Sequence, residues 1–106
     1  MKTKEIAGKN NVNYHMGKNF SIDTIIAQFA HIDEIIDMGC NCIEMETAAL
    51  FKSAEICNIS AGAVFSVSDN TIMKKSLLSG MTKDEKEYEK NVRKNVLTKI
   101  VIESFL

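Results

Sequence analysis

The chain contains no proline, a single arginine and no long apolar run. A complete enzyme with many ligand loops rarely lacks proline, whereas a short α/β segment can do so. The apolar runs are too short and too interrupted to span a bilayer. The formal net charge of −1 gives no electrostatic reason to expect a nucleic acid or an anionic membrane as a partner. No apolar core follows the opening Met-Lys-Thr-Lys-Glu, so we expect no secretory signal and a cytoplasmic protein.

Residues suited to metal binding or nucleophilic catalysis are also few. The three cysteines are an odd number, and Cys40 and Cys42 are spaced too closely for a zinc knuckle. We therefore expect reduced, packed thiols, no metal site and no cofactor. His15 and His31 are the only histidines, and no Ser/His/Asp arrangement can be argued around them.

The 106 residues suffice for one small domain, which we expect to cover 1–106 with a mobile polar segment at 1–12. Ser21 is a candidate helix N-cap, and Gly39 is a natural helix stop. A capping box, Thr82 with Glu85, predicts the start of a long amphipathic helix that runs to Phe105. The full pattern predicts strands at 12–20, 40–45 and 61–67, helices at 30–38, 46–58 and 82–105, and a loop at 71–80. Strands that alternate with helices indicate an α/β fold with a parallel or mixed sheet.

Acidic residues follow two of the predicted strands. Glu44 and Glu46 lie at the end of the predicted strand 40–45, and Asp69 follows the predicted strand 61–67. Ligands of open α/β sheets lie outside the carboxyl ends of the strands. A carboxylate such as Glu46 can accept hydrogen bonds from both hydroxyls of a ribose diol, and Met45 can pack against a sugar ring. The alternative is that these carboxylates only stabilise the positive end of the next helix.

Ser68, Asp69 and Asn70 follow the apolar run 61–67. We expect Asp69 to be partly desolvated there, which suits a general acid. The alternative is that the three residues only close a strand with a turn. Lys74 and Lys75 are interpreted as a solvated loop, with phosphate binding as the lesser option. The sequence shows no glycine-rich phosphate loop.

Taken together, three motifs resemble those of the nucleoside phosphorylase family. They are Glu-Met-Glu-Thr-Ala-Ala-Leu-Phe at 44–51, Ser-Val-Ser-Asp-Asn at 66–70, and Gly-Met-Thr at 80–82 before the last helix. The family includes purine nucleoside phosphorylases, uridine phosphorylases and methylthioadenosine/adenosylhomocysteine nucleosidases. The resemblance covers about residues 14–106. It implies the carboxyl-terminal part of a three-layer phosphorylase/hydrolase-like fold, with a mixed sheet, flanking helices and a long last helix.

The resemblance also implies a role for each matching residue. Asp69 corresponds to the acid that protonates the purine ring as the glycosidic bond breaks, which is more typical of purine-cleaving members. Glu46 corresponds to the residue that binds the ribose 2′ and 3′ hydroxyls. The remaining implied substrate-binding residues lie beside the sugar and base or cover the base: Met45, Glu44, Ile43, Ser68, Asn70, Ser21 and Ile25.

The implied activity is phosphorolysis of a purine nucleoside, with inorganic phosphate as co-substrate. The alternatives are a phosphate-independent nucleosidase and a non-catalytic remnant or subunit of a split phosphorylase. Relatives are about twice as long, so we expect either a homo-oligomer or association with an amino-terminal half that binds phosphate. Many relatives carry an arginine where Met81 stands, and Arg93 in the last helix is not expected to replace it.

Overall fold

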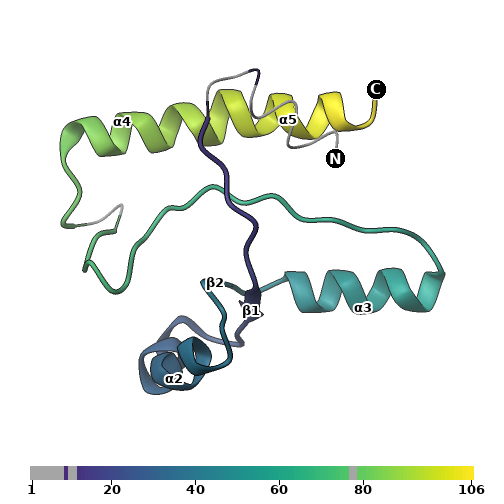
Figure 1. The fold of residues 1–106 in the computed structure, drawn as a ribbon, viewed down its shortest axis with the longest axis horizontal. Coiled ribbons are helices and arrows are strands. Elements are labelled where there is room, and N and C mark those ends of the chain that lie inside the picture. The colour runs from purple at the N-terminus through teal and green to yellow at the C-terminus, as the bar shows by residue number, and fades with distance from the viewer. Residues whose placement is uncertain (1–8, 10–11, 77–78) are drawn as a thin grey trace. The chain divides into compact units, whose positions relative to one another are not determined.

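The computed structural model describes residue 9 and residues 12–76 and 79–106. The chain divides into two compact units. We call His15–Ala63 the strand unit. We call Val64–Leu106, with the described residues before His15, the long-helix unit. The elements are shown in Figure 1.

The strand unit is built on a short parallel β-pair. Strand β1 (Asn19–Ser21) pairs with β2 (Cys42–Glu44), with Phe20 opposite Ile43 and Ser21 opposite Glu44. Helix α2 (Ile25–Asp37) connects the two strands. The predicted strands 12–20 and 40–45 therefore each form over three residues. The mixture of helices with a parallel strand pair is an α/β arrangement.

Helix α2 begins earlier than its periodicity indicated. Its N-cap is Thr24, whose Oγ1 accepts a hydrogen bond from the Ala27 backbone N–H at 3.1 Å. Ser21 is not the cap, because its hydroxyl is engaged elsewhere. The helix ends before Gly39, as predicted, and Gly39 has a φ of +79°, which glycine adopts at little cost. Ile35 is the most deeply buried side chain of the helix, at 2% exposed.

Helix α3 (Thr47–Cys57) follows β2 directly. Asn58 ends it in the left-handed conformation, with a φ of 55°, and the predicted helix 46–58 also ends at this residue. The Ile59 N–H then reaches the carbonyl of Ala54 at 3.0 Å, which satisfies a terminal acceptor. Thr47 and Ala54 are buried, so the start and the middle of α3 each contribute to the packed interior.

The predicted strand at 61–67 is not formed. Figure 1 shows an extended segment without strand pairing after α3. In the described part of the chain, the sheet consists of β1 and β2 alone. An apolar run becomes a buried strand only when a neighbouring strand accepts its backbone hydrogen bonds and both of its faces are covered. Here Val64, Phe65 and Val67 are exposed instead.

The last helix of the long-helix unit is continuous (Figure 1) and consists of α4 (Lys83–Asn91), η1 (Val92–Val96) and α5 (Leu97–Ser104). The predicted capping box is confirmed. Thr82 Oγ1 accepts from the Glu85 N–H at 3.1 Å, and the Glu85 carboxylate accepts from the Thr82 N–H at 3.2 Å. Segment η1 has the wider π-helical hydrogen bonding. Ile100 is buried on the predicted apolar stripe, and Val96 packs against it.

Arg93 forms an ion pair within this helix. Its Nε donates to Oε1 of Glu89 at 3.0 Å, one helical turn earlier. Glu89 is only 5% exposed, so the guanidinium neutralises a buried carboxylate. The arginine is thereby held on its own helix. None of the helices in the described part has the length and apolar character needed to cross a membrane.

Candidate functional site

The carboxylate of Glu44 connects three elements of the strand unit. Its Oε1 accepts hydrogen bonds from Nδ2 of Asn19, at 2.6 Å, and from the Ser21 hydroxyl. Its Oε2 accepts from the backbone N–H groups of Glu46, at 2.7 Å, and of Thr47, at 2.6 Å. We call this arrangement the Glu44 clamp, because one side chain joins β1, the end of β2 and the start of α3.

Ser21 completes the clamp. While its hydroxyl donates to Glu44, its oxygen accepts from the Ala48 N–H at 2.9 Å. The Ile22 N–H also donates to the carbonyl of Glu44 at 2.9 Å. Two of the free backbone donors of the α3 N-terminus are thus satisfied from β2, and one from β1. Glu44 and Ser21 are therefore brought into contact, as members of one hydrogen-bond network.

The clamp also determines the charge of Glu44. Partial burial alone raises the pKa of a carboxyl, but the hydrogen bonds from Ser21 and Asn19, and then from the backbone of Glu46 and Thr47, lower the pKa of Glu44 well below its usual range. Glu44 is therefore ionised at neutral pH, and its four hydrogen bonds are made within the protein. Its implied place beside the base and sugar stays a prediction.

Glu46 has a different environment from Glu44. It is the N-cap residue of α3, yet its side chain makes no capping hydrogen bond. Its Oε2 accepts instead from the Met45 N–H at 3.2 Å, and the carboxylate is exposed. The alternative role of stabilising the positive helix end thus belongs to Glu44. Glu46 keeps an open carboxylate at the strand end, where it is able to accept hydrogen bonds from a diol.

The three other implied substrate-binding residues of the strand unit differ in how far their side chains are exposed. Ile43 lies in β2 and is partly buried. Met45 is exposed, which leaves its flexible thioether free to pack against a ligand. Ile25 is the first residue of α2 and is also exposed.

The thiols require one correction. Cys40, Cys42 and Cys57 are free, but Cys57 is exposed on α3 and is not packed as expected. Burial, followed by the nearby Cys40 and Glu44, raises the pKa of the Cys42 thiol. Cys42 therefore stays protonated and unreactive at neutral pH.

The second group of predicted residues lines a pocket in the long-helix unit. The pocket has a volume of about 170 Å³ and combines thioethers with charged side chains. Its lining consists of Val67, Ser68, Asp69, Asn70, Met73, Lys75, Met81 and Glu85. We call it the Asp69 pocket. Ser68, Asp69 and Asn70 are therefore brought together, and Met81 lies with them.

Within this pocket Asp69 is more accessible than expected. Its side chain is exposed, because the strand that was to bury it is not formed. The Ser68 hydroxyl donates to Oδ2 of Asp69 at 2.5 Å and so restricts the carboxylate. Asn70 takes part in a turn, because its Oδ1 accepts from the Met73 N–H at 3.1 Å, although the described residues 61–69 before this turn form no strand.

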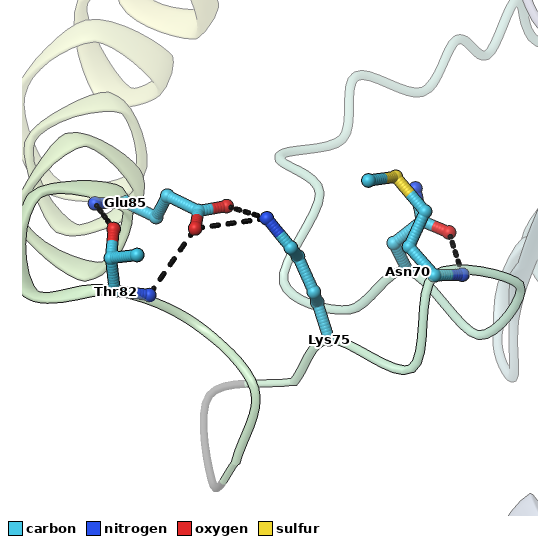
Figure 2. A network of polar contacts seen from close by, with 5 residues as sticks. Asn70, Lys75, Thr82 and Glu85 are labelled. Atoms are coloured by element: carbon cyan, nitrogen blue, oxygen red, sulfur yellow. Dashed lines mark hydrogen bonds and ion pairs between the residues drawn. The ribbon is translucent and has the colours of Figure 1, made fainter.

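An ion pair crosses the loop that forms the pocket (Figure 2). Nζ of Lys75 lies 2.9 Å from Oε1 and 2.8 Å from Oε2 of Glu85. The Lys75 backbone pairs with Asn70 in both directions, at 2.7 Å and 3.0 Å. The interpretation of Lys75 as a solvated loop residue is therefore wrong. The Lys75 side chain, and then the Thr82 backbone, lower the pKa of Glu85, so the pair is ionic at neutral pH.

Sequence reasoning missed Asn19, Lys75 and Glu85 as parts of these two groups. Glu85 was identified only as a helix cap, and its second partner lies ten residues earlier, across a loop. The sequence feature that could have indicated this ion pair is a loop lysine, Lys75, placed shortly before a capping box that contains a glutamate, Glu85. Asn19 gave no signal, because its bond to Glu44 depends on the register between β1 and β2.

The two groups belong to different compact units: Glu44 and Glu46 to the strand unit, Asp69 to the long-helix unit. A family model described as "Phosphorylase superfamily" matches residues 2–103, a range that contains both groups. The comparisons with curated proteins and with solved structures gave no match.

Proposed function

Because the chain belongs to the phosphorylase superfamily, we propose that it acts as a purine-type nucleoside phosphorylase. The reaction is cleavage of the N-glycosidic bond of a purine nucleoside by inorganic phosphate, which yields the free base and ribose 1-phosphate. The observation that carries this proposal is the Asp69 pocket. It presents a carboxyl group, an ammonium group and two methionines, Met73 and Met81, around a hollow of about 170 Å³.

In the proposed reaction an oxygen of phosphate forms a bond to the anomeric carbon. The bond from that carbon to the ring nitrogen breaks, and its electron pair moves onto the base. Asp69, whose carboxyl group is open to solvent, takes a proton from water and passes it to the imidazole-ring nitrogen of the base, so that the base leaves uncharged. Glu46, whose carboxylate is exposed, is assigned to the 2′ and 3′ hydroxyls of the ribose, from which it can accept hydrogen bonds. No resident cofactor or metal takes part.

The test is release of free base from inosine, adenosine and uridine, with and without phosphate. We expect base release from a purine nucleoside that requires phosphate and yields ribose 1-phosphate in equal amount. Release in the absence of phosphate would support a nucleosidase instead. Cleavage of uridine in preference to both purine nucleosides would contradict the purine assignment, and no release from any substrate would support a non-catalytic subunit.

The second candidate function is that of a subunit, and it is favoured by exposed apolar side chains. On α2, Ile25, Ile26 and Phe29 are 63%, 82% and 64% exposed. Large apolar side chains clustered on one helix favour burial against a partner. In this proposal the chain contributes the carboxyl-terminal part of a three-layer fold in the cytoplasm. A second copy, or an amino-terminal half that binds phosphate, covers this helix.

We therefore expect the isolated chain to self-associate. Sedimentation velocity over a range of protein concentrations should show a weight-average mass that rises above 11.8 kDa. The variant Ile26→Lys should shift the distribution toward the monomer, whereas Lys52→Gln on exposed α3 should not. A monodisperse, cooperatively melting monomer at all concentrations would contradict this expectation.

A further inference from the structure

We propose that Lys75 determines which purine the Asp69 pocket accepts, and that it selects bases with a carbonyl at the six position over bases with an amino group there. This inference rests on the proposed function, because it takes the Asp69 pocket as the base site. The observation behind it is that Lys75 and Asp69 line one pocket, with the lysine held in place by Glu85.

The first step is the number of donors and acceptors in the ion pair. A lysine ammonium has three N–H donors and no acceptor. Two point at the oxygens of Glu85, which leaves one for a ligand. The Glu85 carboxylate has about four acceptor positions. Lys75 occupies two of them and the Thr82 N–H a third. The pair therefore presents mainly a cationic donor to the pocket.

The second step is that the ammonium is held in place. Figure 2 shows the Lys75 side chain extended toward Glu85, and the same Glu85 carboxylate is fixed by the capping box with Thr82. The backbone of Lys75 is fixed as well, by its two hydrogen bonds to Asn70. The lysine thus forms part of the same short segment that carries Asp69, and its side chain is only about one-third exposed, at 32%.

The third step is the chemistry of the purine edge. In a 6-oxopurine the ring nitrogen N7 and the adjacent O6 are both acceptors, whereas in adenine N7 is followed by an amino donor. If Asp69 protonates N7, the free N–H of Lys75 meets either O6 or the amino group. With O6 it forms a charge-assisted hydrogen bond to a neutral carbonyl acceptor. With adenine, the N–H of Lys75 faces the amino group, which is also a hydrogen-bond donor, so that no hydrogen bond forms between them.

The test compares hypoxanthine and adenine as binding probes for the full chain, by calorimetry or by NMR titration. We expect hypoxanthine to bind roughly 10-fold to 100-fold more tightly, the range that one good directional contact gives between bases. In Lys75→Met this ratio should fall to near one, and in Lys75→Arg it should be largely retained. Lys83→Met, which removes an exposed charge from the first residue of α4 outside the pocket lining, should leave it unchanged.

Three results would overturn the inference: binding of adenine equal to or tighter than that of hypoxanthine, a ratio unchanged in Lys75→Met, or no binding of either base. Circular dichroism identifies a variant that fails to fold. If Lys75→Met does not fold, Lys75→Gln, which also removes the charge, takes its place, and an unchanged ratio in Lys75→Gln overturns the inference. Cleavage assays with inosine and adenosine separate this inference from the proposed function. Selective base binding without cleavage would contradict only the phosphorylase activity. Inosine cleavage with unchanged selectivity in Lys75→Met would contradict only the role of Lys75.

Discussion

The substitution Asp69→Asn is expected to lower kcat for inosine phosphorolysis by roughly 10²-fold to 10⁴-fold, the usual contribution of a general acid. Asparagine has nearly the same shape and can still accept the hydrogen bond from the Ser68 hydroxyl, but it has no acidic proton to give. The base would then leave as an anion. Because binding contacts are largely kept, KM should change much less than kcat.

A nucleoside methylated at N7 provides the decisive comparison. Its base already carries the positive charge that protonation would supply, so its cleavage needs no acid. We expect Asp69→Asn to cleave 7-methylguanosine at close to the wild-type rate while it fails on inosine. Asp84→Asn, which removes an exposed carboxylate from the first turn of α4, is the matched control and should behave as wild type on both. An equal loss on both substrates would show that Asp69 acts by some means other than proton donation.

Features that depend on neighbouring residues could be predicted from the sequence. The capping box of Thr82 and Glu85, the stop at Gly39 and the helix end at Asn58 all depend on contacts within about five residues. Propensity and capping rules describe this range directly. The three main helices were therefore predicted, although α2 begins at Ile25, earlier than expected.

Features that depend on distant partners could not be predicted in the same way. The apolar run 61–67 carries a strand pattern, but a pattern does not supply the neighbouring strand that must accept its hydrogen bonds. For the same reason the exposure of Asp69 was not foreseen. Ser21 has the composition of a helix cap, yet pairing between β1 and β2 places it opposite Glu44, where its hydroxyl joins the clamp.

The site shows the same division. The sequence identified Glu44, Glu46 and Asp69 as chemically significant, but it could not assign different tasks to two glutamates two residues apart. That difference arises from backbone geometry. The N–H groups of Glu46 and Thr47 both point at Glu44, while the Glu46 side chain stays outside the cap. The ion pair of Lys75 could not be predicted in this way, because its partner Glu85 lies across a loop.

The substitution Glu44→Gln is expected to lower the free energy of unfolding by about 2–3 kcal/mol. The clamp has only donors facing it, from Asn19, Ser21 and two backbone N–H groups. In a glutamine side chain, an NH₂ group replaces one of the two carboxylate oxygens and therefore faces two of these donors without accepting a hydrogen bond. The remaining oxygen still accepts from the other two donors, but it no longer carries the negative charge that strengthens those bonds. Chemical denaturation of the two proteins at pH 7 measures the difference.

We expect the stability difference between wild type and Glu44→Gln to depend on pH. Because folding lowers the pKa of Glu44, the native state binds its proton less readily than the unfolded chain does. The stabilisation is therefore complete above the ordinary carboxyl pKa of about 4.3 and declines as the pH falls below it. The stability difference between wild type and Glu44→Gln should be largest near neutral pH and should shrink in acid.

Glu55→Gln is the matched control for this experiment. Glu55 forms an exposed ion pair with Lys52 on α3, and such pairs contribute about 0–1 kcal/mol. If both glutamate variants lose the same small amount, Glu44 does not hold β1, β2 and α3 together. If Glu44→Gln alone is destabilised and its KM for a nucleoside also rises, the clamp has a second consequence. The backbone that it fixes carries Glu46, so a loosened clamp would release the carboxylate proposed to bind the diol.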